Sequence, residues 1–318
     1  MLARIANNVF WMGRYLERAE HLARYSREQY FTTLDAPYTI NKKLALESIL
    51  RMGGSYDEYR EKYDNITSER VFNFTTRDPD NVMSIQEMIK IARENARSAR
   101  YKLSDETWEA INKFYHYVNE CASLKFRDEQ RYDFYQSIIN NTYITKGFIT
   151  NTLMRDHVWT IINTGVHLEK AIQINRMLIS RYTDLSRMDS EKLITPVENY
   201  LWATLLKTTD CLDIARRVYK SEINKNVVLH FLILNKQFPK SILHNLKSVI
   251  RSLHSLESKE MEVGSLEFEA EKLESRIKFL TMAEIRAASD EETLKYLIEC
   301  LDKLNQLAVM FEKKYLSW

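Results

Sequence analysis

Two stretches of this chain repeat each other: GRYLERAEHLAR at residues 13–24 and GVHLEKAIQINR at residues 165–176. They align without a gap, and seven of the twelve positions are identical or exchange Arg for Lys or Leu for Ile. A second pair follows at nearly the same offset, where residues 71–85 align with residues 228–242 and both end in Ser-Ile. These repeats predict two related halves of about 155 residues, an ordinary domain size.

The composition around the repeats is that of a helical protein. The 318 residues include only 6 Gly and 4 Pro, and 45% of them are apolar. Leu, Ile, Glu, Lys and Arg recur at the three- and four-residue spacings of amphipathic helices. We therefore expect an all-α fold made of two helical-bundle halves, residues 1–150 and 151–318, related by internal duplication and packed together. No linker-like segment separates these halves.

Charge and cysteine content exclude several classes of protein. The 46 Lys and Arg residues nearly balance 44 Asp and Glu residues, so no overall field would recruit nucleic acid or an anionic membrane. Cys121, Cys211 and Cys300 are far apart and offer neither a disulfide framework nor a zinc site, so we expect buried, reduced thiols. The sequence shows no export signal and no run of about 18 apolar residues, which predicts a cytoplasmic protein.

Turn-forming residues mark where the helices begin and end. The expected helices cover about residues 2–31, 40–52, 152–181, 196–219 and 241–258, with a final helical pair from about residue 268. Pro37 cannot continue the first helix, and Gly53 allows the second to end. Ser84 and Glu87 have the spacing of a capping box, which predicts a helix start at that point.

The first repeat lies in a helix with a single apolar stripe. At about 100° per residue, the stripe is formed by Ile5, Val9, Met12, Leu16, Ala19 and Ala23. Glu20 borders this stripe, and Arg24 follows one turn later, at a spacing that favours an ion pair. Glu17 and Gly13 lie on the same flank, where a glycine lets another backbone or a ligand approach closely. We therefore expect a close, charged contact along this flank.

The second repeat is chemically poorer than the first. It keeps Gly165, Glu169 and Arg176 but has Ile172 in place of Glu20. A carboxylate at a core edge is costly to bury unless it is paired, so Glu20 requires a partner. Three explanations stay open: a structural Glu–Arg network, a pocket in which arginines hold a carboxylate or phosphate, or a metal site. Against the metal site, no Glu-x-x-His spacing occurs in the chain.

Several motifs, in order along the chain, resemble the bacterial alpha-E domain proteins. The first is FWMGRYLERAEHLAR at residues 10–24. The others are DPDN with SI at 78–85, ARENAR at 92–97, WEAIN at 108–112, MRDHVW at 154–159 and FPKS at 238–241. The resemblance covers essentially the whole chain. The chain departs from the family pattern at four positions. Val166, Ile172, Asn235 and Lys240 stand where the family tends to have Arg, an acid, Asp and Arg, respectively.

The resemblance implies an all-helical protein and a set of candidate site residues. The candidate catalytic groups are Glu17, Glu20 and Asp156. The candidate substrate-binding groups are Arg14, Arg18, Arg24, Arg93, Glu94, Asn95, Arg97, Arg155, Trp159, Glu169 and Arg176. No metal and no cofactor is expected.

The resemblance also implies partners. Members of the family accompany, or are fused to, a circularly permuted ATP-grasp ligase, often with a transglutaminase-like peptidase. We expect a helical partner subunit of such a peptide- or amide-forming ligase, holding the acceptor peptide or carrier in a groove lined by Glu and Arg. The alternative is an enzyme in its own right, using a Glu/Arg/Asp pocket for acid–base chemistry on an amide or amino-acid substrate. Neither nucleic acid nor a membrane is expected as a partner.

Overall fold

A computed structural model describes residues 2–35, 42–188, 195–256 and 262–316. Within these ranges the fold is all-α, as predicted, and contains no strand. The helices of the first part of the chain are α1 (Ala3–Asp35), α2 (Lys42–Gly53), α3 (Tyr56–Lys62), α4 (Ser68–Thr76), α5 (Ile85–Ser98), the 3₁₀ turn η1 (Arg100–Lys102), α6 (Asp105–Ala122) and α7 (Asp128–Thr152).

The second part of the chain begins with the other long central helix. Its elements are α8 (His157–Ser186), α9 (Thr195–Thr208), α10 (Leu212–Tyr219), α11 (Lys225–Leu229), the π-helical turn η2 (His230–Leu234), α12 (Ile242–Leu256), α13 (Leu266–Lys278), α14 (Met282–Ala287), α15 (Asp290–Phe311) and the π-helical turn η3 (Glu312–Leu316).

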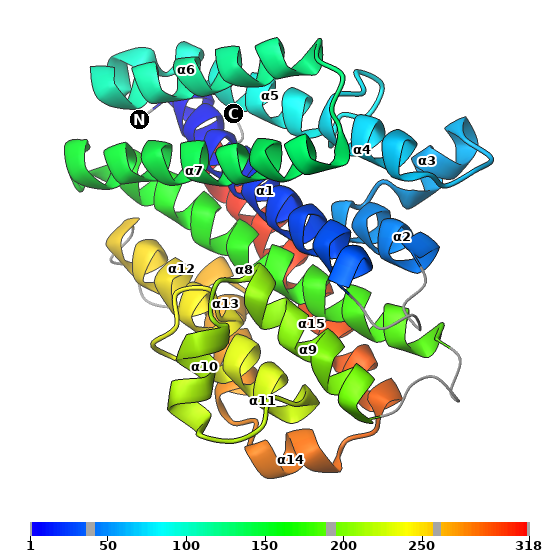
Figure 1. Ribbon diagram of the computed structural model, residues 1–318. Coiled ribbons are helices and arrows are strands. Elements are labelled where there is room, and N and C mark those ends of the chain that lie inside the picture. Colours follow the sequence, from blue (N-terminus) through cyan, green and yellow to red (C-terminus); the bar gives the residue numbers. More distant parts are fainter. Residues whose placement is uncertain (1, 36–41, 189–194, 257–261, 317–318) are drawn as a thin grey trace.

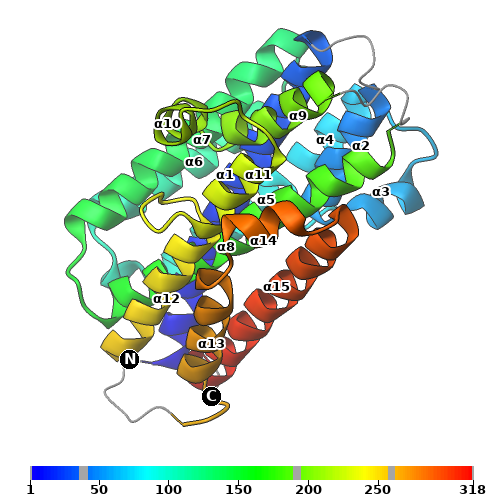
Figure 2. The same ribbon diagram turned by 90° about the horizontal axis from the view of Figure 1, so that it is seen from below.

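Helices α1 and α8, which carry the two sequence repeats, form the centre of the molecule (Figure 1). Helices α5, α7 and α2 also pack on α1, and α6 covers α5 and α7. Helices α12 and α15 pack on α8, and α13 lies across both of them (Figure 2). The chain ends beside its beginning, because Phe311 stacks on Phe10 with 4.8 Å between ring centroids. The repeats thus build the axis around which the other helices are arranged.

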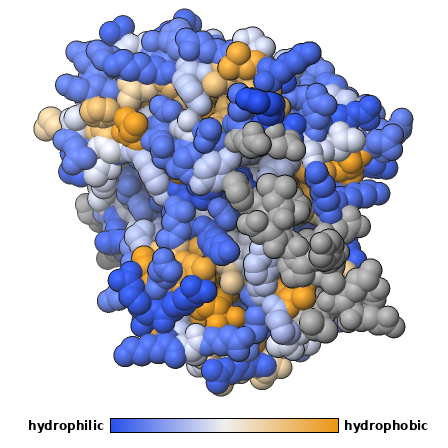
Figure 3. All heavy atoms as spheres, in the orientation of Figure 1, coloured by the Kyte–Doolittle hydropathy of each residue, from blue (hydrophilic) through white to orange (hydrophobic). Residues whose placement is uncertain are grey.

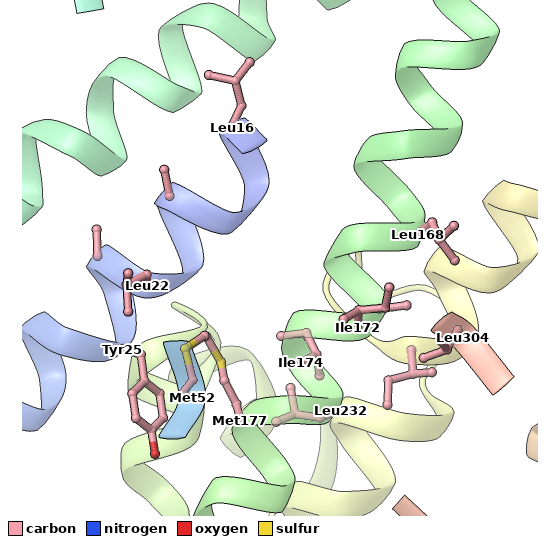
Figure 4. Close-up of a cluster of buried hydrophobic side chains, with 14 of the residues drawn as sticks. Leu16, Leu22, Tyr25, Met52, Leu168, Ile172, Ile174, Met177, Leu232 and Leu304 are labelled. Carbon is pink, nitrogen blue, oxygen red and sulfur yellow. The ribbon is translucent and has the colours of Figure 1, made fainter. Parts of the chain in front are cut away.

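Apolar side chains of both central helices meet in one core (Figure 4). Leu22 of α1 lies near Met52 of α2 and Met177 of α8, and Leu168 on the other side of α8 points toward Leu304 of α15. All of these side chains are buried. The apolar stripe predicted for the first helix is therefore the face that α1 turns toward the core. The surface seen in Figure 3 is mostly hydrophilic, with scattered apolar patches.

Most of the sequence-based expectations for the helices are confirmed. The first two helices lie where predicted, and Ser84 caps α5 by accepting a hydrogen bond from the Glu87 amide. All three cysteines are buried and unpaired. Within the described residues, no helix combines the length and apolar character needed to cross a bilayer.

Two predicted helices were wrong in extent. The segment predicted as one helix over residues 196–219 is broken between α9 and α10, where Asp210 has a φ of 53°. The helix predicted over 152–181 begins only at His157, because Asp156 caps α8 there. The final pair includes a third short helix, α14. The boundary proposed after residue 150 falls in the last turn of α7, and the common origin of the two halves stays a prediction.

Candidate functional site

The two repeat glycines lie where α1 and α8 cross. A β-carbon added to Gly165 would lie 2.6 Å from the Phe10 carbonyl oxygen, and one added to Gly13 would lie 3.0 Å from the Ile162 carbonyl oxygen. Each glycine therefore faces the residue three positions before the other glycine. The repeat positions contact each other reciprocally, and the two backbones approach too closely for any side chain at these positions.

The charged residues after each glycine pair crosswise between the helices. Arg18 Nε donates to Glu169 Oε1 over 2.6 Å, and Lys170 Nζ lies 3.7 Å from Glu17 Oε1. Glu17-Arg18 of one repeat thus faces Glu169-Lys170 of the other, acid to base in both directions. In the alignment of the repeats, Glu17 corresponds to Glu169 and Arg18 corresponds to Lys170. The two contacts are therefore equivalent under the repeat.

Glu169 forms the first of two buried ion clusters. It accepts hydrogen bonds from Arg14 Nε (2.7 Å), Arg18 Nε (2.6 Å) and Gln173 Nε2 (2.7 Å), and we call these four residues the Glu169 cluster. Burial alone would raise the pKa of Glu169, but the two guanidinium groups outweigh it and lower that pKa to about 2. Trp11 lies against Arg14, 4.6 Å from its guanidinium carbon. Arg14 Nη1 also donates to Glu312 Oε1 over 3.3 Å, so the two arginines face two carboxylates.

Glu17 and Glu20 form the second cluster with Arg24 and Lys146, and we call these four residues the Glu17 cluster. Lys146 Nζ donates to Glu17 Oε1 (2.6 Å) and to Glu20, while Arg24 Nε donates to Glu20 Oε1 (2.7 Å). Burial opposes ionisation of both carboxyls, but the neighbouring cations together, Lys146 with Lys170 at Glu17 and Lys146 with Arg24 at Glu20, outweigh it and hold both pKa values below the ordinary range. Both glutamates are therefore charged, and the predicted Glu20–Arg24 pair is confirmed.

A histidine beside this cluster is neutral. His21 Nδ1 lies 2.9 Å from the Glu17 carbonyl oxygen, and burial lowers the pKa of His21 to about 4. Two buried atoms here have no hydrogen-bond partner in the described part of the chain, His21 Nε2 and Glu17 Oε2. A cluster this dense usually satisfies its polar atoms. The interior face of the Glu17 cluster therefore keeps unused hydrogen-bonding capacity.

Toward the surface, Arg24 connects the Glu17 cluster to a group of polar side chains. It donates to Asp210, at the break between α9 and α10, and to the Tyr143 hydroxyl of α7. Lys240 completes this group: its Nζ donates to the Thr209 carbonyl oxygen (3.1 Å) and to Tyr143 Oη (3.3 Å). The left-handed backbone at Asp210 thus places its carboxylate beside Arg24.

A pocket of about 380 Å³ opens over these residues, and we call it the lysine pocket. Its cationic and polar lining consists of Lys146, Lys170, Lys240, His167, Thr150 and Asn163. Its aromatic and apolar lining consists of Tyr143, Trp159, Ile149, Ile162, Val166 and Pro239. These residues come from α7, α8 and the loop before α12. The lysine pocket is therefore amphipathic, lined by both ammonium groups and apolar side chains.

Burial changes the charge balance of this pocket. It lowers the pKa of Lys170, and together with the charge of Arg24 it lowers the pKa of Lys240 to about 8. His167 is held neutral, because burial and the neighbouring Lys170 lower its pKa to about 4. The pKa of Lys146 is raised instead, because the charges of Glu17 and Glu20 together outweigh the cost of burying its ammonium group. Lys170 and Lys240 are thus under-compensated cations.

The structure brings only some of the predicted site residues together. Glu17, Glu20 and Arg24 share one cluster, and Arg14, Arg18 and Glu169 share the other. Trp159 lines the lysine pocket, and Arg155 lies over its ring at 4.2 Å. Asp156 is exposed, and its carboxylate caps α8 by accepting from the Val158 and Trp159 amides. Arg176 lies against Gly54, and burial lowers its pKa while the charge of Glu169 opposes this.

The ARENAR motif lies elsewhere. Arg93 donates to Asn112 of α6 (3.1 Å), and Arg93 and Arg97 both pair with Glu94. Asn95 is half-buried on the same helix. The polar contacts of this motif join α5 to α6 and do not reach the lysine pocket.

Sequence reasoning missed Lys240 and four other residues of the site. Lys146, Tyr143 and Asp210 belong to no repeat and have no partner nearby in sequence, so no local signal marked them. Lys170 could have been found, because it occupies the position of Arg18 in the second repeat. No group of three or more acidic, His or Cys side chains able to hold a metal occurs among the residues that the structure describes.

One family model matches residues 1–316, that of the Alpha-E domain, described as a predicted alpha-helical domain with a conserved ER motif. The chain belongs to the Alpha-E family. Two Glu-Arg pairs occur in this Alpha-E chain, Glu17-Arg18 and Glu69-Arg70. The first lies at the crossing of α1 and α8, where its two side chains point into different ion clusters.

The curated relatives of this Alpha-E chain are longer proteins. The uncharacterised proteins Mb2597 of Mycobacterium bovis and Rv2567 of Mycobacterium tuberculosis are each 22% identical to it over 272 residues. The match covers 80% of this chain and 30% of each relative. The chain therefore spans less than a third of the length of these relatives. No solved structure matches it at a significant level.

Proposed function

We propose that this Alpha-E chain is a helical partner subunit of an ATP-grasp-type peptide or amide ligase, and that it holds the acceptor in the lysine pocket. The ligase, and a transglutaminase-like peptidase as a further partner in the cytoplasm, come from the resemblance to the family. The observation that carries the binding role is the lysine pocket itself. Its volume of about 380 Å³ suits a small molecule or the end of a peptide.

The ion clusters support a binding role for the site over an acid–base role. Glu17 and Glu20 are held as carboxylates by Lys146 and Arg24, and their lowered pKa values make them weak bases. Their charge instead fixes Lys146 at the pocket wall. A rigid wall built by ion pairs is what a binding site requires, because its groups need no rearrangement when the ligand enters.

The second candidate function is an acid–base enzyme acting on an amide or amino-acid substrate. One observation favours it: Lys240 lines the pocket, and its pKa of about 8 makes a neutral amine available near physiological pH. Glu20→Gln separates the two functions. A partner subunit keeps its ligase and its fold, whereas an enzyme that uses Glu20 loses about two or more orders of magnitude in rate.

The test is capture followed by ligation. The purified chain is immobilised, native extract of its source organism is passed over it with and without ATP, and retained proteins are identified by mass spectrometry. The retained ligase is then assayed for ATP-dependent amide formation with wild type, Lys170→Gln and the control Lys113→Gln. Lys113 is exposed on α6, where it pairs with Glu109.

We expect an ATP-grasp ligase to be retained, and its product formation to fall with Lys170→Gln but not with Lys113→Gln. Retention of no such ligase, or amide formation that is the same without the chain, would refute the partner role. Turnover by the chain alone would establish the enzyme instead.

A further inference from the structure

We propose that the lysine pocket recognises a small organic dianion, a phosphate monoester or a dicarboxylate, whose charged end binds Lys170 and Lys240 and whose body lies on the apolar side chains of the lining. This inference rests on the proposed function in one respect, that the dianion is part of the acceptor used by the ligase. The anion site itself follows from the charges and the hydrogen bonds around the pocket.

The first step is the charge balance. Four cations, Lys146, Lys170, Lys240 and Arg24, surround the inner end of the pocket, and three carboxylates, Glu17, Glu20 and Asp210, face them. Arg14 and Arg18 add no net charge here, because Glu169 and Glu312 balance them. His167 is neutral and cannot compensate a charge. All three carboxylates make their short contacts with Lys146 or Arg24, so neither Lys170 nor Lys240 has a hydrogen-bonded carboxylate of its own within the described residues.

The second step is the hydrogen bonding of the two lysines. A lysine ammonium has three donors. Lys170 Nζ makes no hydrogen bond within the described ranges, since Glu17 Oε1 is 3.7 Å away. Lys240 donates only to uncharged oxygens, and its nearest carboxylate oxygen, on Asp210, is 3.6 Å away. Both lysines thus have donors to spare at a wall that faces the pocket.

The number of charges on the ligand follows from these lysines. Each lacks a short contact to a carboxylate, and each gains a charge-assisted hydrogen bond from an oxyanion. A monoanion compensates one ammonium group and leaves the other repelled by its cationic neighbours. A dianion with two or more oxygens on one end compensates both.

The third step concerns the apolar side chains that line the pocket. Trp159, Ile162 and Val166 project from one face of α8, at spacings of three and four residues, and line the pocket. A free phosphate ion would leave this surface wet and most of the 380 Å³ unfilled. A ligand with a small apolar or aromatic body covers it. The occupant is therefore an organic anion.

The experiment is isothermal titration calorimetry on the purified full chain with four probes. Phenyl phosphate and homophthalate are dianions with an aromatic body, inorganic phosphate lacks the body, and phenylacetamide lacks the charge. We expect at least one of the two organic dianions to bind tenfold or more tightly than both reference probes. Preference for phenyl phosphate assigns a phosphorylated ligand, and preference for homophthalate assigns a dicarboxylate.

Variants place the site. Lys170→Gln and Lys240→Gln should each weaken binding of the preferred dianion about tenfold or more, and Lys113→Gln should leave it unchanged. In the unmutated chain, the same dianion should protect Lys240 from acetylation, measured by mass spectrometry, which gives a readout independent of the variants' folding. Absence of saturable dianion binding, or binding without protection of Lys240, would overturn the proposal.

Failure here is distinguishable from failure of the proposed function. Anion binding is measured on the chain alone, and ligase capture does not depend on the pocket being charged. A captured ligase with no anion binding overturns only this inference, whereas anion binding with no ligase overturns only the partner role.

Discussion

Glu169 is a fully buried carboxylate between two guanidinium groups, so its charge determines whether the crossing of α1 and α8 is stable. Glu169→Gln keeps the shape but leaves Arg18 without its anion and Arg14 with only the longer contact to Glu312 (3.3 Å). Removing one partner of a buried ion pair costs about 3 to 5 kcal/mol. We expect that decrease in the free energy of unfolding at pH 7, measured by urea denaturation. Glu109→Gln, at an exposed pair on α6, is the control and should change it by about 0.5 kcal/mol or less.

The same carboxylate predicts a dependence of stability on pH. The pKa of Glu169 falls from 4.5 to about 2 on folding. Because the folded pKa is depressed, its contribution is complete above pH 4.5 and is lost as the pH falls through 2. The stability difference between wild type and Glu169→Gln should therefore shrink by more than half between pH 5 and pH 3. Urea titrations at several pH values measure this difference, and a constant value would contradict the lowered pKa.

Lys240 should titrate well below an ordinary lysine. Burial, Arg24 and Lys146 favour its neutral form, while Glu20 and Asp210 oppose this, and the resulting pKa is about 8. Since only the neutral amine reacts with acetic anhydride, its acetylation rate should rise with a midpoint near pH 8, against about 10.4 for an ordinary lysine. Peptide mass spectrometry after short labelling pulses gives the midpoint. A midpoint above 10 would show that Lys240 is an ordinary solvated lysine.

At the scale of single residues, the sequence predicts contacts within one helix but not contacts between segments that are distant in the chain. Glu20 and Arg24 are one turn apart, so their pairing could be inferred from spacing alone. Lys146 reaches Glu17 and Glu20 from 129 and 126 positions away. No periodicity links such residues, because only the packing of α7 on α1 brings them together. The sequence therefore predicted the Glu20–Arg24 pair of the Glu17 cluster but not its contacts with Lys146.

At the scale of the helices, the two glycines of the repeats are predicted to be irreplaceable. A β-carbon at Gly165 would meet the Phe10 carbonyl oxygen at 2.6 Å, and a backbone atom cannot move aside as a side chain can. We expect Gly165→Ala to destabilise the chain by about 2 kcal/mol or more. The matched control is Gly147→Ala in α7, where nothing lies within 4 Å.

Gly147→Ala should stabilise the chain by about 0.5 to 1 kcal/mol, because alanine loses less backbone entropy on forming a helix. Thermal and urea unfolding of both variants test the pair. Equal effects of the two substitutions would show that the crossing tolerates a methyl group and that the repeat glycine has another role.

Helix ends were predictable where a capping residue or a glycine marks them. Ser84 and Gly53 gave the correct boundaries of α5 and α2. The break at Asp210 was missed because no glycine or proline stands there, although Thr208, Thr209 and Asp210 are weak helix formers. A positive φ at an aspartate has no strong local signal. In this conformation Asp210 pairs with Arg24 of α1. A prediction made one helix at a time does not include such a contact.

At the scale of the molecule, the repeat was the most informative feature of the sequence. It singled out the two helices that the structure places at the centre, although their crossing at the two glycines was not predicted. It could not locate the lysine pocket, whose lining also comes from α7 and from the loop before α12. That pocket depends on the arrangement of the outer helices around the central pair, and no pattern within one helix encodes this arrangement.

The central crossing makes the two halves dependent on each other for stability. Without the second half, α1 would expose the apolar surface that packs on α8, and Arg14 and Arg18 would lose Glu169. Fragments 1–154 and 155–318, expressed separately, should therefore each lack cooperative thermal unfolding by circular dichroism. Mixed in equal amounts from denaturant, they should recover one cooperative transition, because the complete core forms only when both are present. A fragment that unfolds cooperatively alone would show that its half is an independent domain, with the crossing serving only to join the two.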